Sequence, residues 1–238
     1  MNREYHKWWS PALGREMELL IFGQAGQPVL VFPTSMGRFF EFEDREMIAA
    51  LAEPIEAGRL QLFCLDSIDT ESWYNRNIPP PERVLRHMQY EHYLLTEVLR
   101  FVKFRNAAGR IAVTGCSFGG YHALNFTLKH PEFVNHCLSM SGAFDIRQFL
   151  GGHHDDNAYY NNPVDYLPRL ADQQLLDEYC HNIQFDLATG ERDICLDDNL
   201  RMSRIMEVKG IPHRLDIWGS HAAHDWVWWQ QMVRKFFC

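Results

Sequence analysis

Ser117 stands in a sequence pattern that is typical of a nucleophile. It is the centre of residues 115–119 (GCSFG), a G-x-S-x-G string that follows the apolar run 111–114 and precedes a helical stretch. A strand that turns sharply into a helix holds the central side chain in a strained conformation, with its hydroxyl above the sheet. The flanking glycines let neighbouring backbone approach closely, and the first N–H groups of the helix face developing negative charge. Ser117 is therefore the candidate nucleophile.

Cys116 is a second potential nucleophile, because thiols attack more readily than hydroxyls. It lies one residue before the apex of the predicted turn, so its side chain is expected to point into the core. We interpret Cys116 as a packing residue.

An acid and a histidine should follow such a serine in that order, each just after a later strand. Asp193 follows the predicted strand 185–188 and is the candidate acid. Glu191 and Asp197 are the alternatives, although Asp197 is also suited to capping the helix predicted after it.

Two histidines follow the predicted strand 213–218 and could act as the base. His224 stands next to the start of the last predicted helix, where a short tether would hold its ring over the serine. His221 lies nearer the strand and is interpreted as a supporting residue. We therefore predict His224 as the base, with His221 as the alternative.

Segments 153–156 (HHDD) and 221–225 (HAAHD) contain side chains that can bind divalent ions. Residues 221–225 have no third and fourth ligand at usable spacing. Residues 153–156 follow Gly151-Gly152 and are interpreted as a flexible, solvated loop. An activated serine also needs no Lewis acid. We therefore expect no metal and no cofactor. His122, one turn into the helix after Ser117, is interpreted as a packing residue.

The tetrahedral intermediate of acyl transfer needs two N–H donors for its oxyanion. The backbone N–H of Phe118, the residue after the nucleophile, is the first predicted donor. The second is expected from residues 33–37 (PTSMG), which follow the predicted strand 29–32.

The elements that must position these residues alternate along the whole chain. Apolar runs bounded by Gly, Pro or Asp predict buried strands at 17–22, 29–32, 60–65, 111–114, 136–140, 185–188 and 213–218. Helical spacing of apolar residues predicts helices at 43–57, 82–104, 120–130, 196–209 and 225–237. Segments 67–81 and 149–177 are predicted to be long loops that shape the site. This alternation favours one α/β domain over residues 1–238, with a mostly parallel sheet.

Composition excludes several classes of function. The chain has 46% hydrophobic residues and a formal charge of −8, so a nucleic-acid partner, which would require a basic face, is not expected. No apolar run has the length of a signal peptide or a membrane span. The six scattered cysteines are interpreted as free thiols, which favours a cytoplasmic location.

Five segments together resemble the esterase D-type branch of the α/β-hydrolases. They are residues 115–123 (GCSFGGYHA), 130–133 (HPEF), 141–145 (SGAFD), 190–193 (GERD) and 224–226 (HDW). The resemblance implies a three-layer α/β-hydrolase sandwich without a separate lid domain. It also implies Ser117, Asp193 and His224 as the triad, and Ser35 or Met36 as the second oxyanion donor.

The expected activity is hydrolysis of a small-molecule carboxylic ester through an acyl-enzyme. A thioesterase or an acyltransferase with the same triad is an alternative, as is an inactive scaffold that binds a ligand. Trp73, Tyr74 and Trp226 are predicted to line an apolar substrate pocket, the alternative for each being core packing.

Overall fold

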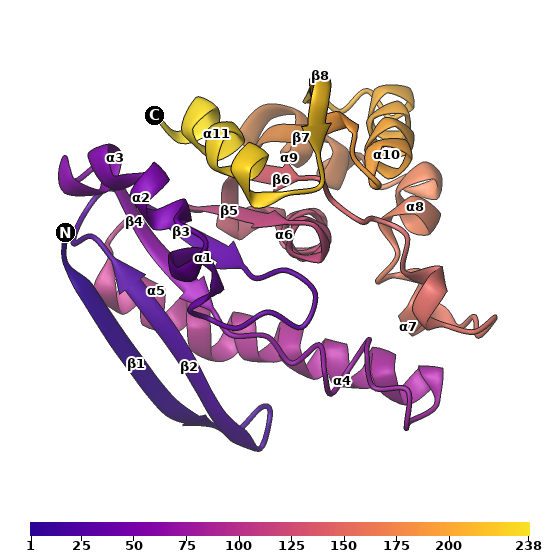
Figure 1. Cartoon of the computed structure of the whole chain (residues 1–238). Helices are drawn as coiled ribbons and strands as arrows, with labels where there is room; N and C mark the ends of the chain where they lie inside the picture. The colour runs from indigo at the N-terminus through magenta and orange to yellow at the C-terminus, as the bar shows by residue number, and fades with distance from the viewer.

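The computed structural model describes all residues 1–238 and confirms the α/β fold, a mixed sheet flanked by helices (Figure 1). Eight strands form the sheet in the order β1-β2-β4-β3-β5-β6-β7-β8. Their bounds are β1 Arg3–Ser10, β2 Arg15–Phe22, β3 Gln27–Phe32, β4 Leu60–Leu65, β5 Ile111–Cys116, β6 Val134–Met140, β7 Gln184–Arg192 and β8 Arg214–Ala223. The six strands from β4 to β8 in this order are parallel, as predicted, whereas β1 and β2 run antiparallel to their neighbours.

Strand β1 is the one strand that the sequence analysis missed. It pairs with β2 from Arg3↔Phe22 to Ser10↔Arg15 at one edge of the sheet. Its residues alternate between exposed and half-buried up to the buried Ser10. Such an edge strand has no continuous apolar run, which is the sequence signal that predicts a buried strand.

Helices cover both faces of the sheet (Figure 1). They are α1 Glu41–Asp44, α2 Met47–Ala50, α3 Ala52–Glu56, α4 Pro80–Tyr93, α5 Leu99–Arg105, α6 Phe118–Lys129, α7 Asp156–Tyr159, α8 Pro163–Tyr166, α9 Gln173–Asn182, α10 Leu196–Val208 and α11 Trp226–Phe237. Helices α1 to α3 and α11 share one apolar cluster with the sheet, and α4 to α6 share the other with α9 and α10. No helix is long and apolar enough to cross a membrane.

The central strands show why the core divides into two clusters. In β5, Ile111 and Val113 belong to the cluster under α6, whereas Ala112 and Cys116 belong to the cluster under α11. Successive side chains of a strand point to opposite faces. Every residue of β5 is buried, which explains its continuous apolar run.

Two predicted segments differ in the structure. The predicted helix 43–57 is three short helices, interrupted at Glu46, which has a φ of 59°. The predicted loop 149–177 contains α7, α8 and the start of α9. The N-terminal signals of these helices are Asp155 and Asp172, whose carboxylates accept backbone N–H groups, and Pro163 in the first turn of α8. These capping residues were not recognised as helix starts because the segment is rich in Tyr and Asn.

Gly119, in the first turn of α6, packs directly against the end of β3. A Cβ atom added there would lie 2.4 Å from the Phe32 carbonyl oxygen and 2.6 Å from that of Pro33. Both contacts are backbone atoms, so relief would require the loop after β3 to move. Helix α6 and this loop can therefore pack in direct contact only because residue 119 has no side chain.

Gly119→Ala is predicted to lower the free energy of unfolding by about 2 kcal/mol or more, because it overpacks this contact. Gly109→Ala is the matched control, since nothing lies within 4 Å of its added Cβ. Urea unfolding of both variants tests the prediction. Equal stability of the two variants would contradict it.

Glu91 joins α4 to the end of α6. It accepts a hydrogen bond from His130 Nε2 at 2.7 Å and pairs with the Lys129 ammonium group. Burial alone would raise the pKa of its carboxyl group, but these two partners lower the pKa to about 2. The folded-state pKa is thus below the ordinary value of about 4.3. This ion pair therefore stabilises the fold above about pH 4.5, and its contribution is lost as the pH falls toward 2.

Glu91→Gln is predicted to lower the free energy of unfolding by about 2–3 kcal/mol at pH 7. The difference from wild type should shrink between about pH 4.5 and 3, because Glu91 of the unfolded wild-type chain binds a proton in this range while Glu91 of the folded chain stays ionised until about pH 2. Urea unfolding across this range measures it. Glu53→Gln, in an exposed pair with Arg59, should change nothing measurable. A difference at Glu91 that does not vary with pH would refute the assignment.

Candidate active site

Ser117 occupies the sharp turn between β5 and α6. Its backbone has φ 57° and ψ −122°, a left-handed conformation that a serine rarely adopts. The Ser117 N–H donates to the Met140 carbonyl oxygen at 2.8 Å, and the Ser117 carbonyl accepts from the N–H groups of Gly120 at 3.0 Å and Ala143 at 3.2 Å. These bonds hold the strained residue at the carboxyl end of the central strands.

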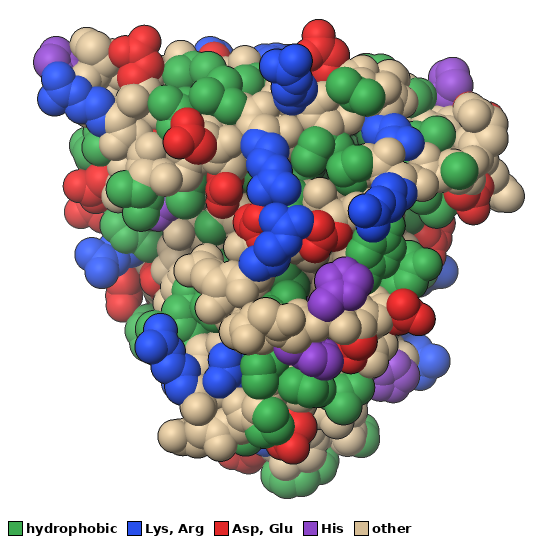
Figure 2. Space-filling model, turned by 90° about the vertical axis from the view of Figure 1, so that its right-hand side faces the viewer, with side chains coloured by type: hydrophobic (Ala, Val, Ile, Leu, Met, Phe, Trp, Pro, Cys, Tyr) green, Lys and Arg blue, Asp and Glu red, His purple; other side chains and the backbone are tan.

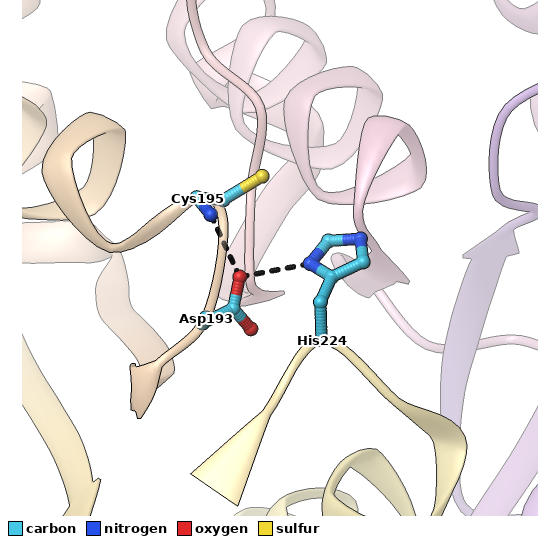
Figure 3. Close-up of side chains that lie close together, drawn as sticks. All are labelled: Asp193, Cys195 and His224. Carbon is cyan, nitrogen blue, oxygen red and sulfur yellow. Dashed lines mark hydrogen bonds and ion pairs between the residues drawn. The ribbon is translucent and has the colours of Figure 1, made fainter.

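The side chains of Ser117, His224 and Asp193 form a hydrogen-bonded chain. His224 follows β8, and its Nε2 lies 2.9 Å from Ser117 Oγ. Its Nδ1 lies 2.8 Å from Oδ1 of Asp193, which follows β7. Figure 3 shows the His224 ring turned so that one nitrogen faces Asp193 and the other points away from it. Three separate loops therefore bring together the three residues proposed from the sequence.

Asp193 is buried, and its carboxylate accepts two further hydrogen bonds. Ser141 Oγ donates to Oδ2 at 2.5 Å, and the backbone N–H of Cys195 donates to Oδ1 at 2.8 Å. Ser141 Oγ in turn accepts a bond from Trp229 Nε1 at 2.8 Å. Burial raises the pKa of the Asp193 carboxyl group, but the bonds from His224, Ser141 and Cys195 outweigh it, so the pKa is lowered. Asp193 is therefore ionised and fixed in orientation.

The alternatives that the sequence left open lie elsewhere. His221 is an exposed residue on β8, and Glu191 and Asp197 are exposed as well. None of the three has a hydrogen bond to Ser117 or His224 in the structure. Strand β8 extends five residues beyond the predicted end at residue 218. This extension places His224, and not His221, in the loop over the serine.

The loop of residues 33–37 lies beside the start of α6, where Gly119 contacts Phe32 and Pro33. The Met36 N–H donates to Asp69 Oδ2 at 3.2 Å, whereas the Ser35 N–H has no partner within the protein. Phe118 is the first residue of α6, so no preceding turn of the helix accepts its N–H. The N–H groups of Ser35 and Phe118 are therefore both without an acceptor in the protein.

The three aromatic residues predicted to contact substrate differ in exposure. Tyr74 is partly exposed and donates from its hydroxyl to Ser35 Oγ at 2.6 Å. Trp226 is partly exposed and packs edge-on against Trp229. Trp73 is completely buried against His87 and Phe149. The prediction that Trp73 lines the pocket is therefore wrong, because its ring belongs to the core.

Asp193, Cys195 and His224 form the one group of three potential metal ligands in the structure. Figure 3 shows that Cys195 presents its backbone nitrogen to the carboxylate. Burial and the neighbouring carboxylates raise the pKa of its thiol to about 12, so the thiolate that a metal requires is disfavoured. The Asp193 and His224 atoms are already engaged with each other. This donor set fits a hydrogen-bonded triad better than a metal site.

The other predicted residues also have structural partners. Cys116 is buried, and burial raises the pKa of its thiol well above the ordinary value. In the segment 153–156, Asp155 caps α7 by accepting the Ala158 N–H and pairs with His153. His122 does more than pack, because its Nε2 lies 3.1 Å from Asp69 Oδ1. His122 and Ser141 lie in residues 115–123 and 141–145, two of the segments that carry the family resemblance. No other feature of the sequence indicated that these two residues make supporting contacts.

Figure 2 looks onto the carboxyl end of the sheet, the side at the right of Figure 1. Basic and acidic side chains are interspersed on this face, so it has no broad field of one sign. Four cavities of about 290 to 510 Å³ open elsewhere, and none is lined by Ser117, Asp193 or His224. The serine therefore lies outside these four cavities.

Comparisons with known proteins agree with this architecture. A ferulic acid esterase superposes with a TM-score of 0.79 at 15% identity, covering 99% of this chain and 96% of that protein. An S-formylglutathione hydrolase from Staphylococcus aureus gives 0.76 at 14% identity, covering 99% and 97%. One from Agrobacterium tumefaciens gives 0.71 at 16% identity, covering 98% and 92%. At these identities the superpositions show the shared fold. No curated protein sequence matches this chain.

The sequence model of one family covers almost the whole chain. It is the model described as Putative esterase, and it matches residues 10–235. The match includes all three loops that carry Ser117, Asp193 and His224. The chain therefore belongs to the Putative esterase family of α/β-hydrolases.

Proposed function

We propose that the protein is a serine esterase that hydrolyses small carboxylic esters through an acyl-enzyme. The observation that carries this proposal is the chain of hydrogen bonds from Ser117 Oγ to His224 and from His224 to Asp193, at 2.9 and 2.8 Å. It begins at a serine with a strained backbone at the start of a helix. A serine on such a turn, with a base and an orienting acid in hydrogen-bond reach, is an activated nucleophile.

His224 Nε2 takes the proton of Ser117 Oγ as that oxygen attacks the ester carbonyl carbon. The carbonyl oxygen becomes an oxyanion and accepts hydrogen bonds from the Phe118 and Ser35 N–H groups. His224 then gives its proton to the departing alcohol, which leaves the acyl group on Ser117. Water attacks this acyl-enzyme, with His224 as base, and releases the acid. Ionised Asp193 stabilises the histidinium form in both halves of the reaction.

A small acyl group fits the site best. Phe118, Phe149 and Tyr74 pack edge-on against one another, with ring centroids 4.8 to 5.8 Å apart, and the Tyr74 hydroxyl of this group donates to Ser35 Oγ. Four cavities of about 290 to 510 Å³ are not lined by the triad. A long acyl chain would therefore lie on the surface, where little apolar area is removed from water.

Ser117→Ala is predicted to lower kcat for p-nitrophenyl acetate by about 10³-fold or more. Wild type should be labelled stoichiometrically at Ser117 by a fluorophosphonate, and its activity should fall as the acyl chain of the ester lengthens. Cys116→Ala is the matched control and should keep most activity, because the Cys116 thiol is buried.

Three outcomes would count against this assignment. An active Ser117→Ala variant, or labelling at another residue, would remove Ser117 as the nucleophile. A folded wild type that is neither labelled nor active would favour a binding scaffold. Faster turnover of thioesters, or transfer to added alcohols, would favour the thioesterase or acyltransferase alternative.

Ser141→Ala is predicted to lower kcat by about 10-fold, because Asp193 loses a hydrogen bond that orients its carboxylate. KM should change little, since Ser141 is buried away from substrate. Ser139→Ala, two residues earlier and on β6, is the matched control, because the buried Ser139 hydroxyl has no hydrogen-bond partner. Steady-state kinetics of both variants test this role, and equal losses at the two serines would disprove it.

A further inference from the structure

We propose that the buried pair Asp69–His122 is a positioning device for the oxyanion hole, which selects Ser35 over Met36 as the second N–H donor. This inference rests on the proposed esterase function. It assigns a role to two side chains that neither attack the substrate nor belong to the Ser117–His224–Asp193 chain.

The Asp69 carboxylate joins the two elements that carry the donors. Its Oδ2 accepts the Met36 N–H at 3.2 Å, from the loop of residues 33–37. Its Oδ1 lies 3.1 Å from His122 Nε2, on helix α6. The Asp69 and His122 side chains are only 2% and 3% exposed. Asp69 therefore links the loop to the helix through one buried group.

His122 connects this link to the first donor. It lies four residues after Phe118 on α6, so the two side chains occupy the same face of the helix. Their rings pack edge-on with centroids 4.8 Å apart. A displacement of Asp69 or His122 would therefore be transmitted to the start of α6 as well as to the loop.

The bond to Asp69 decides which N–H of the loop is available. Met36 has a φ of 57°, a conformation that has an energetic cost for a residue with a side chain. The hydrogen bond to Asp69 offsets this cost and occupies the Met36 N–H. The preceding N–H, that of Ser35, is left without a protein partner.

The segment that carries Asp69 also holds Ser35 by its side chain. The Tyr74 N–H donates to the Asp69 carbonyl oxygen at 2.9 Å, which closes a turn. The Tyr74 hydroxyl then donates to Ser35 Oγ at 2.6 Å. Asp69 and Tyr74, which belong to one turn, therefore bind the neighbouring loop residues Met36 and Ser35. Thr34 is held separately by Glu41, which accepts from its N–H at 2.8 Å and its hydroxyl at 2.7 Å.

Catalysis depends on this geometry because oxyanion donors act only when they are fixed before the reaction. Loss of one donor typically lowers kcat by about 10²–10³-fold. A donor that is present but displaced should produce a smaller loss. The loss should appear in kcat and not in KM, because the oxyanion exists only in the transition state and the intermediate.

Asp69→Ala is expected to lower kcat by about 10–100-fold, with KM within about threefold of wild type. Affinity for a short alkyl boronic acid, whose tetrahedral adduct needs the same donors, should fall by a similar factor. Asp69→Asn should restore kcat to within about fivefold, because its amide oxygen still accepts the Met36 N–H. His122→Phe keeps the ring packing without the nitrogen, and it should lose kcat in the same direction as Asp69→Ala.

Asp186→Ala is the matched control. Asp186 is 1% exposed and pairs with His136 at 2.8 Å, near the start of β7 and away from the carboxyl end of the sheet. Its loss should destabilise the fold but leave kcat within about twofold. Urea unfolding of each variant separates stability from activity. If Asp69→Ala does not fold, His122→Phe and Asp69→Asn decide the question.

Wild-type kcat in folded Asp69→Ala or His122→Phe would overturn the proposal. So would equal kcat losses at Asp69 and Asp186, or a change confined to KM. If wild type itself neither hydrolyses esters nor is labelled at Ser117, the proposed function fails, and this inference fails with it. If wild type is active but the Asp69 variants match it, only the positioning role is lost.

Discussion

The site depends on one constraint, the left-handed backbone at Ser117. That conformation is unfavourable for a residue with a side chain, and it persists because surrounding backbone leaves no alternative. Met140, Gly120 and Ala143 satisfy the peptide groups of the serine. Gly115 and Gly119 allow α6 to begin against β5 and β3, since a Cβ at either would collide with backbone. The serine hydroxyl is thereby presented before any substrate arrives.

Around this turn, each functional group is held by a buried polar contact from a different element. Ser141, the residue after β6, donates to Asp193 and accepts in turn from Trp229 of α11. Asp69 and Tyr74 contact the loop of residues 33–37. Buried polar groups of this kind are costly unless they are fully paired. Their pairing ties the orientation of the candidate triad and oxyanion donors to the stability of the core.

Several predictions could be made from the sequence because the signal was local. Residues 111–119 contain the apolar strand, both glycines and the serine in one continuous segment, and the alternation of strands and helices indicated the α/β sheet. The weak signals were also local. Strand β1 lies at the edge of the sheet, and α7 and α8 are single turns. The π-helical segment Leu94–Val98 interrupts the predicted helix 82–104.

The sequence by itself determined the fold class, the turn at Ser117 and the order of the acid and the histidine after it. Only the tertiary structure decided between His221 and His224, placed Trp73 in the core, and paired Asp69 with both Met36 and His122. The physical reason is the range of the interactions. Periodicity and turn propensity act over a few neighbouring residues, whereas Asp69 and His122 are 53 positions apart and Ser117 and His224 are 107 apart. Those side chains meet only when the complete sheet brings its carboxyl ends together.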